Sequence, residues 1–133
     1  MRKKPSLAPL GESEIEMLHQ VWEAGPSTVA EIHQRILASR QVAYTTIMSG
    51  LRKLADKGYL TFSQKGNAYI YEAARPPHEV KFSLLSSILN KVFKGSPVDL
   101  VESLVEHESI SDAEREEIRR LIEQMDDKTS EGS

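Results

Sequence analysis

The fold is decided by one stretch of the sequence, Ala43-Tyr44-Thr45-Thr46-Ile47-Met48-Ser49-Gly50-Leu51-Arg52-Lys53-Leu54, which is followed by Lys57-Gly58. Its apolar residues recur at helical spacing and predict a helix over about 44–57 with one buried face. Gly58 is placed to end that helix as a left-handed C-cap. The opposite face keeps polar and charged side chains, so one side of the helix packs in a core and the other is free to contact a partner.

Two further helices are predicted upstream of this stretch. Apolar residues at helical spacing follow Ser13, and a second such stripe covers about 28–39. Each stripe opens on a candidate capping box, Ser13 with Glu16 and Thr28 with Glu31, in which side chains satisfy the free N–H groups of the first turn.

Downstream of the stretch the hydrophobic period changes from helical to alternating. Residues 59–64 and 68–73 alternate, and Lys65-Gly66-Asn67 separates them. This pattern predicts a β-hairpin, because Gly66 or Asn67 can adopt the positive φ that a tight turn requires. Three helices followed by a hairpin is the element order of a winged helix–turn–helix module.

Consecutive prolines at Pro76-Pro77 mark a domain boundary, since neither a helix nor a central strand continues through them. Beyond them the sequence indicates three helices, two of which start at Ser96-Pro97 and at Ser111 to Glu114. Short helices depend on tertiary packing, so their apolar faces need either the winged domain or a second copy of the chain. The proline hinge favours the second copy, and two-fold dimers are the commonest assembly. We expect dimerisation through Leu84, Leu85, Ile88, Val92, Leu100, Leu104, Ile118, Leu121 and Ile122.

The expected fold class is therefore mainly α. An N-terminal winged helix–turn–helix domain, with three helices and a two- or three-stranded β-wing, precedes a C-terminal three-helix dimerisation domain. The expected domains cover residues 8–75 and 78–126, with flexible tails at 1–7 and 127–133.

Composition and charge limit the classes of function. The chain has 133 residues and no cysteine, which excludes disulfides, thiol catalysis and cysteine-based zinc sites. No secretory signal is recognisable and no apolar run reaches the roughly 20 residues that span a bilayer, so we expect a cytoplasmic protein without membrane insertion. Residues 1–75 carry ten Lys and Arg against seven Asp and Glu, a net charge of +3, whereas residues 76–133 carry seven against thirteen, a net charge of −6. The basic half is the part suited to a polyanion.

The polar face of the helix over 44–57 has the chemistry that reads DNA. A helix in the major groove presents short polar side chains to base edges near its start and cations to phosphates. Threonine hydroxyls suit the first role, and the lysines and arginine suit the second. Lys65, at the hairpin tip, can reach an adjacent phosphate or the minor groove. The expected DNA-binding residues are Ala43, Tyr44, Thr45, Thr46, Ser49, Arg52, Lys53, Lys57 and Lys65.

Enzyme chemistry finds little support in the sequence. The four histidines are scattered without metal-ligand spacing, and neither a nucleophile elbow nor a glycine-rich phosphate loop occurs. We therefore expect no enzyme activity, no metal site and no cofactor. Two other functions stay open. One is a protein-interaction adaptor that docks a partner on its third helix, which the basic face argues against. The other is a ligand-sensing regulator, for which no pocket residues stand out.

The motifs described above resemble the penicillinase-repressor family of winged-helix transcriptional repressors (BlaI/MecI/CopY type). The resemblance covers roughly residues 8–125. It rests on residues 43–54 with Lys57-Gly58, on Leu10 to Leu18, on Val21-Trp22, on Thr28 to Ile32, and on Gly95 to Val101.

The resemblance implies a homodimeric repressor on a palindromic double-stranded DNA operator, with repression relieved through the dimerisation domain. In the best-known members a membrane sensor with a zinc-protease domain triggers cleavage of the repressor. Carried onto this sequence, the cleaved bond falls near Ser103-Leu104, where the penicillinase repressors have an Asn-Phe pair. The absence of cysteine rules out the thiolate copper sensing of the copper-responsive branch. Gly50 also departs from the larger residue usual there.

Overall fold

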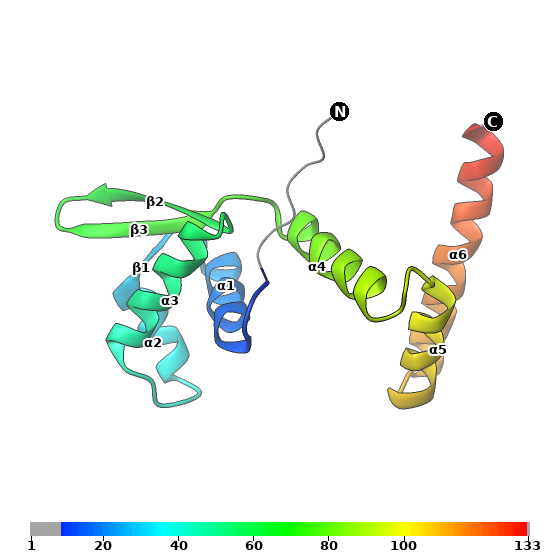
Figure 1. Ribbon diagram of the computed structural model, residues 1–133, viewed down its shortest axis with the longest axis horizontal. Helices are drawn as coiled ribbons and strands as arrows, with labels where there is room; N and C mark the ends of the chain where they lie inside the picture. Colours follow the sequence, from blue (N-terminus) through cyan, green and yellow to red (C-terminus); the bar gives the residue numbers. More distant parts are fainter. Residues whose placement is uncertain (1–8, 133) are drawn as a thin grey trace. The chain divides into compact units, whose positions relative to one another are not determined.

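The computed structural model describes residues 9–132 and the side chains of residues 9–125. Its elements are, in chain order, α1 (Glu12–Ala24), β1 (Ser27–Thr28), α2 (Val29–Leu37), α3 (Tyr44–Asp56), β2 (Leu60–Lys65), β3 (Ala68–Ala73), α4 (Pro77–Lys91), α5 (Pro97–His107) and α6 (Asp112–Gly132) (Figure 1). The predicted fold class, mainly α with a winged helix–turn–helix, is confirmed. The predicted tail at 1–7 lies outside the described residues. None of the helices in the described range is long and apolar enough to cross a membrane.

The wing is a small antiparallel sheet with the strand order β1-β3-β2. β2 and β3 form the predicted hairpin, which extends beyond α3 in Figure 1, and Gly66 makes its turn with a φ of +65°. β1 covers two residues and pairs Ser27 with Tyr71 near the base of β3. The sheet therefore has three strands, the larger of the two expected numbers.

Two predicted capping boxes occur as expected. The Thr28 hydroxyl accepts the N–H of Glu31, and the Glu31 carboxylate accepts the N–H of Thr28 at 2.8 Å, which starts α2. Ser111 and Glu114 exchange the same pair of hydrogen bonds at the start of α6. Both boxes are local in sequence, which is why the sequence predicts them well.

The predicted box of Ser13 and Glu16 is wrong. α1 begins at Glu12, and the carboxylate of Glu14 accepts the N–H of the N-cap residue Gly11 at 3.0 Å. Glu16 is instead held by Arg40, whose Nη2 lies 2.6 Å from its carboxylate. The start of the helix explains the difference, because with Gly11 as the N-cap the third helical residue is Glu14.

The core lies among α1, α2, α3 and the base of the wing. The predicted buried stripe of α3 contributes Ile47, Leu51 and Leu54, none of which is exposed. The other core residues are Met17, Leu18, Val21, Val29, Ile32, Ile36, Tyr59, Leu60, Tyr71 and Val80. The opposite side of α3 is thus held at a fixed place on the surface.

Gly50 lies on the buried side of α3. A side chain there would overlap the thioether of Met17, which reaches across from α1 and is itself buried. Met17 therefore fills the space that a larger residue at position 50 would occupy. Glycine costs a helix interior about 1 kcal/mol relative to alanine, and the close packing of α1 against α3 offsets that cost.

The chain forms two compact units, one up to Ile88 and one from Leu89 onward. Val80 in α4 is fully buried in the core of the first unit, and Leu84 packs partly against that core. The beginning of α4 is therefore part of the winged unit, although the sequence placed the domain boundary at the prolines before it. The reason is that α4 supplies an apolar side chain that completes the core.

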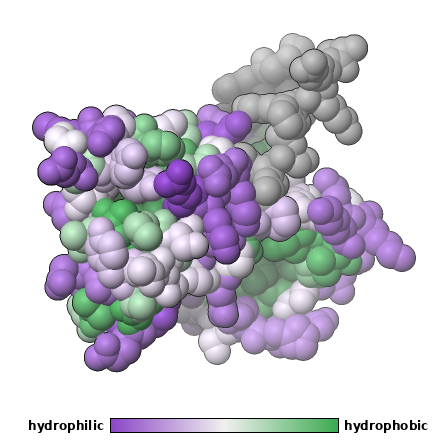
Figure 2. Space-filling view, turned by 60° about the vertical axis from the view of Figure 1, so that its left-hand side comes forward, coloured by the Kyte–Doolittle hydropathy of each residue, from purple (hydrophilic) through white to green (hydrophobic). Residues whose placement is uncertain are grey.

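The second unit has no buried apolar core among its described side chains. Figure 2 shows apolar residues at the surface of the molecule, in green, among hydrophilic residues in purple. The exposed apolar side chains of this unit are Val92, Val98, Val101, Leu104, Val105, Ile118, Leu121, Ile122 and Met125.

Candidate nucleic-acid interface

α3 begins without a side-chain cap. Its N-cap residue, Ala43, has extended backbone angles (φ −74°, ψ 146°) and offers no side-chain acceptor to the first turn. The first N–H groups of a helix have no partner within the helix, and its dipole is positive at that end. The start of α3, at Ala43 and Tyr44, therefore offers free donors to an anionic oxygen such as a phosphate.

Thr45, Thr46 and Ser49 are all exposed on α3. Residues three and four apart in a helix are neighbours, so Ser49 lies one turn after both threonines. Their hydroxyls can donate or accept hydrogen bonds, and threonine methyls can touch the methyl group of thymine. The structure thus brings the three expected base readers together on one surface.

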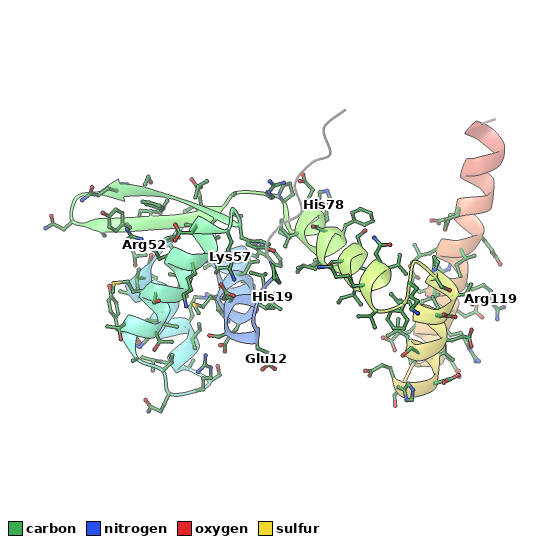
Figure 3. The ribbon with its side chains drawn as sticks, in the orientation of Figure 1. Glu12, His19, Arg52, Lys57, His78 and Arg119 are labelled. Carbon is green, nitrogen blue, oxygen red and sulfur yellow. The ribbon has the colours of Figure 1, made fainter. Side chains whose placement is uncertain are left out.

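Arg52 and Lys53 continue this surface along α3, and both are exposed. Among the described residues, no salt bridge engages Arg52, Lys53 or the hairpin residue Lys65. Arg52 projects from α3 close to the hairpin (Figure 3). Burial raises the pKa of the Tyr71 phenol at the base of the wing, and the positive charge of Arg52 opposes that rise. These cations are free to pair with phosphates.

Lys57 has a different environment from the other predicted phosphate ligands. Its ammonium donates to the Glu14 carboxylate at 2.8 Å and to the Pro9 carbonyl at 3.0 Å, between α3 and α1 (Figure 3). Burial alone would raise the pKa of Glu14, but the hydrogen bonds from the Gly11 N–H and from Lys57 outweigh it and hold the pKa below 4.5. Lys57 therefore ties the end of α3 to the start of α1, and its predicted phosphate contact would require this pair to open.

This ion pair predicts a specific pH dependence of stability. Because the pKa of Glu14 is lowered in the folded state, the pair stabilises the fold above pH 4.5 and the contribution is lost as the pH falls through the lower, folded value. We expect Glu14→Gln to lower stability by about 1 kcal/mol at neutral pH and to reduce the loss of Tm in acid. Thermal unfolding followed by circular dichroism between about pH 3 and 7 measures both effects.

Glu23→Gln is the matched control, because Glu23 makes a longer, exposed ion pair with Arg35 at 3.5 Å. Its acid profile should match that of the unchanged protein. Parallel acid profiles for Glu14→Gln and the unchanged protein would show that the pair does not stabilise the fold.

An open groove of about 810 Å³ separates the start of α1 from the exposed face of α3. On the α3 side it is lined by Thr45, Thr46, Ser49, Gly50, Lys53 and Lys57, and on the α1 side by Gly11 to Glu14 and Met17. Because of the groove, Thr45, Thr46 and Ser49 are accessible from the side of α3 that faces α1 as well as from its exposed face. The carboxylates of Glu12 and Glu14 border it and end the positive surface there.

The wing carries an exposed aromatic pair that the sequence analysis did not single out. Phe62 and Tyr69 lie on the same face of the hairpin and meet edge to face, with ring centroids 5.4 Å apart. Phe62 also contacts Tyr71, which continues this face into the core. Alternation within the two strands could have identified the pair, because positions two apart share a face.

The predicted dimer residues have different surroundings. Leu84 packs against the core of the first unit and Leu100 is half-buried, whereas the others are exposed. Phe82, which is not among the predicted dimer residues, is 69% exposed on α4. Ser103 and Leu104, the predicted cleavage position, lie within α5, with Ser103 half-buried and Leu104 exposed.

Comparison with known proteins gives a consistent result. A family model described as "Penicillinase repressor" matches residues 10–124. The chain is 25% identical over 113 residues to the methicillin resistance regulatory protein MecI of Mammaliicoccus sciuri, covering 85% of this chain and 92% of that protein. It is 30% identical over 84 residues to the transcriptional regulator BlaI of Mycobacterium tuberculosis (strain ATCC 25618 / H37Rv), covering 62% of this chain and 61% of that protein.

Two solved structures are also similar. The Bacillus licheniformis BlaI monomer, in complex with the blaP half-operator, has a TM-score of 0.48 and 18% identity, covering 55% of this chain and 89% of that chain. The complex structure of hsRosR-S4 has a TM-score of 0.52 and 16% identity, covering 94% of this chain and 95% of that chain. The second likeness is one of fold.

Proposed function

The chain belongs to the penicillinase repressor family, and from this premise we propose that it represses transcription by binding operator DNA with α3. The observation that carries the proposal is the exposed surface of that helix. Thr45, Thr46 and Ser49 stand beside Arg52 and Lys53, whose charges are unpaired among the described residues. A helix in the major groove needs these side chains in this order along its length, with hydroxyls that contact bases followed by cations that contact phosphates.

The helix would enter the major groove with its first turn foremost. The uncapped N–H groups at Ala43 and Tyr44 would donate hydrogen bonds to one phosphate. Arg52 and Lys53 would form ion pairs with others. Lys65 at the end of β2 would reach the neighbouring DNA backbone, since the hairpin extends beyond α3 (Figure 1). Phosphate contacts fix the register on the duplex, and the threonine and serine hydroxyls then read bases.

A second copy of the chain is the proposed partner of the second unit. Apart from Val92, its exposed apolar side chains lie in α5 and α6, and none of the unit's described apolar side chains is buried. A two-fold dimer would bury these faces and would present two α3 helices to half-sites about one helical turn, or a multiple, apart.

Relief of repression would act on this pairing. Once one winged unit of a dimer is bound, the other is held at a high effective concentration near the second half-site, which raises the affinity. Loss of the dimer would therefore release the operator even when each winged unit stays intact. Cleavage near Ser103 and Leu104 would cut α5 within the dimerisation surface. A membrane sensor protease is the partner that the family resemblance suggests for that step.

The salt dependence of DNA binding tests the proposed function. Arg52, Lys53 and Lys65 would neutralise about three phosphates per subunit, which should give a slope of log K against log salt near −2.7 for one subunit, and about twice that for a dimer. Fluorescence anisotropy with promoter DNA from the neighbourhood of the gene measures the slope. Arg52→Ala and Lys53→Ala should each flatten it by about one per subunit. If micromolar protein shows no salt-sensitive binding to such DNA, the proposal fails.

A further inference from the structure

The connector between α2 and α3 is held by side chains from α1 and α2. The N–H groups of Ser39 and Arg40 donate to the Ile36 carbonyl and close the end of α2. Arg40 then pairs with Glu16 of α1 through three N–H···O contacts of 2.6 to 3.2 Å. These contacts fix the first half of the connector, away from the start of α3.

His33, on α2, holds the second half of the connector. Its Nε2 lies 2.8 Å from the carbonyl oxygen of Val42. A carbonyl oxygen accepts and cannot donate, so Nε2 carries the proton and donates it. Within residues 9–132, this is the only hydrogen bond to the backbone of Gln41 and Val42.

The imidazole of His33 makes a second contact, to the ring of Tyr44. The two rings meet edge to face, with centroids 5.6 Å apart and planes at 85°. His33 therefore contacts the residue before and the residue after Ala43, which is the N-cap of α3. Ala43 has no side chain able to cap the helix, so the geometry of its first turn depends on these neighbours.

The remainder of α3 is fixed in another way. Ile47, Leu51 and Leu54 are completely buried and set the axis of the helix on the core. The first turn holds Tyr44, Thr45 and Thr46. Just before it the side chain of Val42 packs partly against the core, and the hydrogen bond from His33 fixes the carbonyl of the same residue. A shift of this turn would move the base-reading hydroxyls and leave the core unchanged.

We propose that His33 is a positioning residue that sets the first turn of α3 for sequence-specific DNA recognition. The inference rests on the proposed function, because it names a residue that acts through α3 without touching DNA. Losing the hydrogen bond to Val42 would let the first turn move, so discrimination between DNA sequences would fall before general affinity for DNA does. His33 would thus govern specificity from the side of α2 that faces the connector.

Three substitutions separate the contributions of the ring and of the N–H group. His33→Gln places an amide nitrogen near the position of Nε2, whereas His33→Asn places one near Nδ1, too short to reach Val42. His33→Phe keeps a ring beside Tyr44 but has no donor. The glutamine and asparagine variants are a matched pair, because both carry the same amide group on an otherwise unchanged α2.

The measurement uses the full chain and two duplexes of equal length and composition. One carries the site that the unchanged protein selects from a random library, and the other is its scrambled version. We expect His33→Asn and His33→Phe to lose about three- to tenfold in the ratio of the two affinities, and His33→Gln to stay within about twofold of the unchanged protein. Affinity for the scrambled duplex should not change. Amide ¹H–¹⁵N spectra should show shifts at Tyr44, Thr45 and Thr46 for the asparagine and phenylalanine variants only.

Two results would overturn the inference alone, in a protein that still binds DNA. One is failure of His33→Gln to rescue discrimination. The other is a parallel loss of affinity for both duplexes together with a lower Tm, which would mean that His33 only stabilises the fold. If the unchanged protein selects no site and shows no salt-sensitive binding, the proposed function itself is wrong, and the positioning role of His33 is wrong with it.

Discussion

Leu121→Glu is expected to turn a dimeric protein into a monomer and to lower its affinity for an operator with two half-sites by about a hundredfold or more. Leu121 is 55% exposed on α6, in a unit where none of the described apolar side chains is buried. A glutamate there would have to be desolvated on pairing, and an unpaired buried charge is strongly unfavourable. Sedimentation equilibrium measures the oligomeric state, and anisotropy on duplexes with one or two half-sites measures the affinity.

The matched control is Gln124→Glu, which adds the same charge to α6. At 100° per residue it lies well away from the face that Ile118, Leu121, Ile122 and Met125 share. We expect this variant to remain dimeric and to bind as the unchanged protein does. Affinity for a single half-site should be equal in all three proteins, because the winged unit is untouched. A Leu121→Glu protein that stays dimeric would show that this face of α6 is not the dimer interface.

Replacing both Thr45 and Thr46 with alanine is expected to remove most of the preference for the selected operator over scrambled DNA. Each lost base contact costs about 1 to 3 kcal/mol of discrimination, so losing both should lower the ratio of affinities by roughly 30-fold or more. Both threonines are exposed, and alanine is the better helix former, so the fold should not suffer. Competition binding with the two duplexes measures the ratio, and thermal unfolding checks the fold.

Lys53→Ala is the contrasting variant for this experiment. Lys53 lies on the same helix but offers only a cation, so its loss should weaken binding to both duplexes by a similar factor. If the threonine variant also weakens both duplexes equally, Thr45 and Thr46 contact the backbone rather than the bases, and the assignment of readers on α3 is wrong.

Most of the winged fold follows from local patterns in the sequence. The stripe of Ile47, Leu51 and Leu54 predicts α3, and alternation around Gly66 predicts the hairpin, because both depend on neighbours a few residues away. The family motifs are local in the same sense, since they lie on these elements. The capping boxes at Thr28 and Ser111 were also predicted correctly.

What the sequence did not predict depends on contacts between distant residues. Glu14 caps α1 and holds Lys57, which lies 43 positions away. Strand β1 has only two residues and exists through its pairing with β3. His33, taken as one of several scattered histidines, contacts Val42 and Tyr44 only after α2 and α3 have packed. Periodicity predicts which face of a helix is apolar but does not predict which partner covers it.

The α4 helix shows the same distinction. Its apolar stripe suggested one continuous dimerisation surface, but Leu84 lies against the core of the first unit and Phe82 is fully available for another contact. One helix thus divides its apolar residues between the winged core and an exposed surface. Phe82 and Leu84 are two residues apart and therefore lie on different sides of the helix. The helical period tells which of them contacts the core only once the position of the core is known.

The burial of Val80 decides where the chain can be cleaved while the winged unit stays folded. A fragment ending at Arg75 would lack that side chain, whose burial is worth about 1.5 to 3 kcal/mol, and its interior would be incomplete. A break in α5, far beyond Val80, leaves the interior whole. The N-terminal fragment would then keep a folded winged unit but would lack the proposed dimerisation surface. It could bind single half-sites weakly and compete there with intact dimers. If cleavage in α5 relieves repression, as proposed above, the recovery of repression would therefore depend on how fast such fragments are cleared.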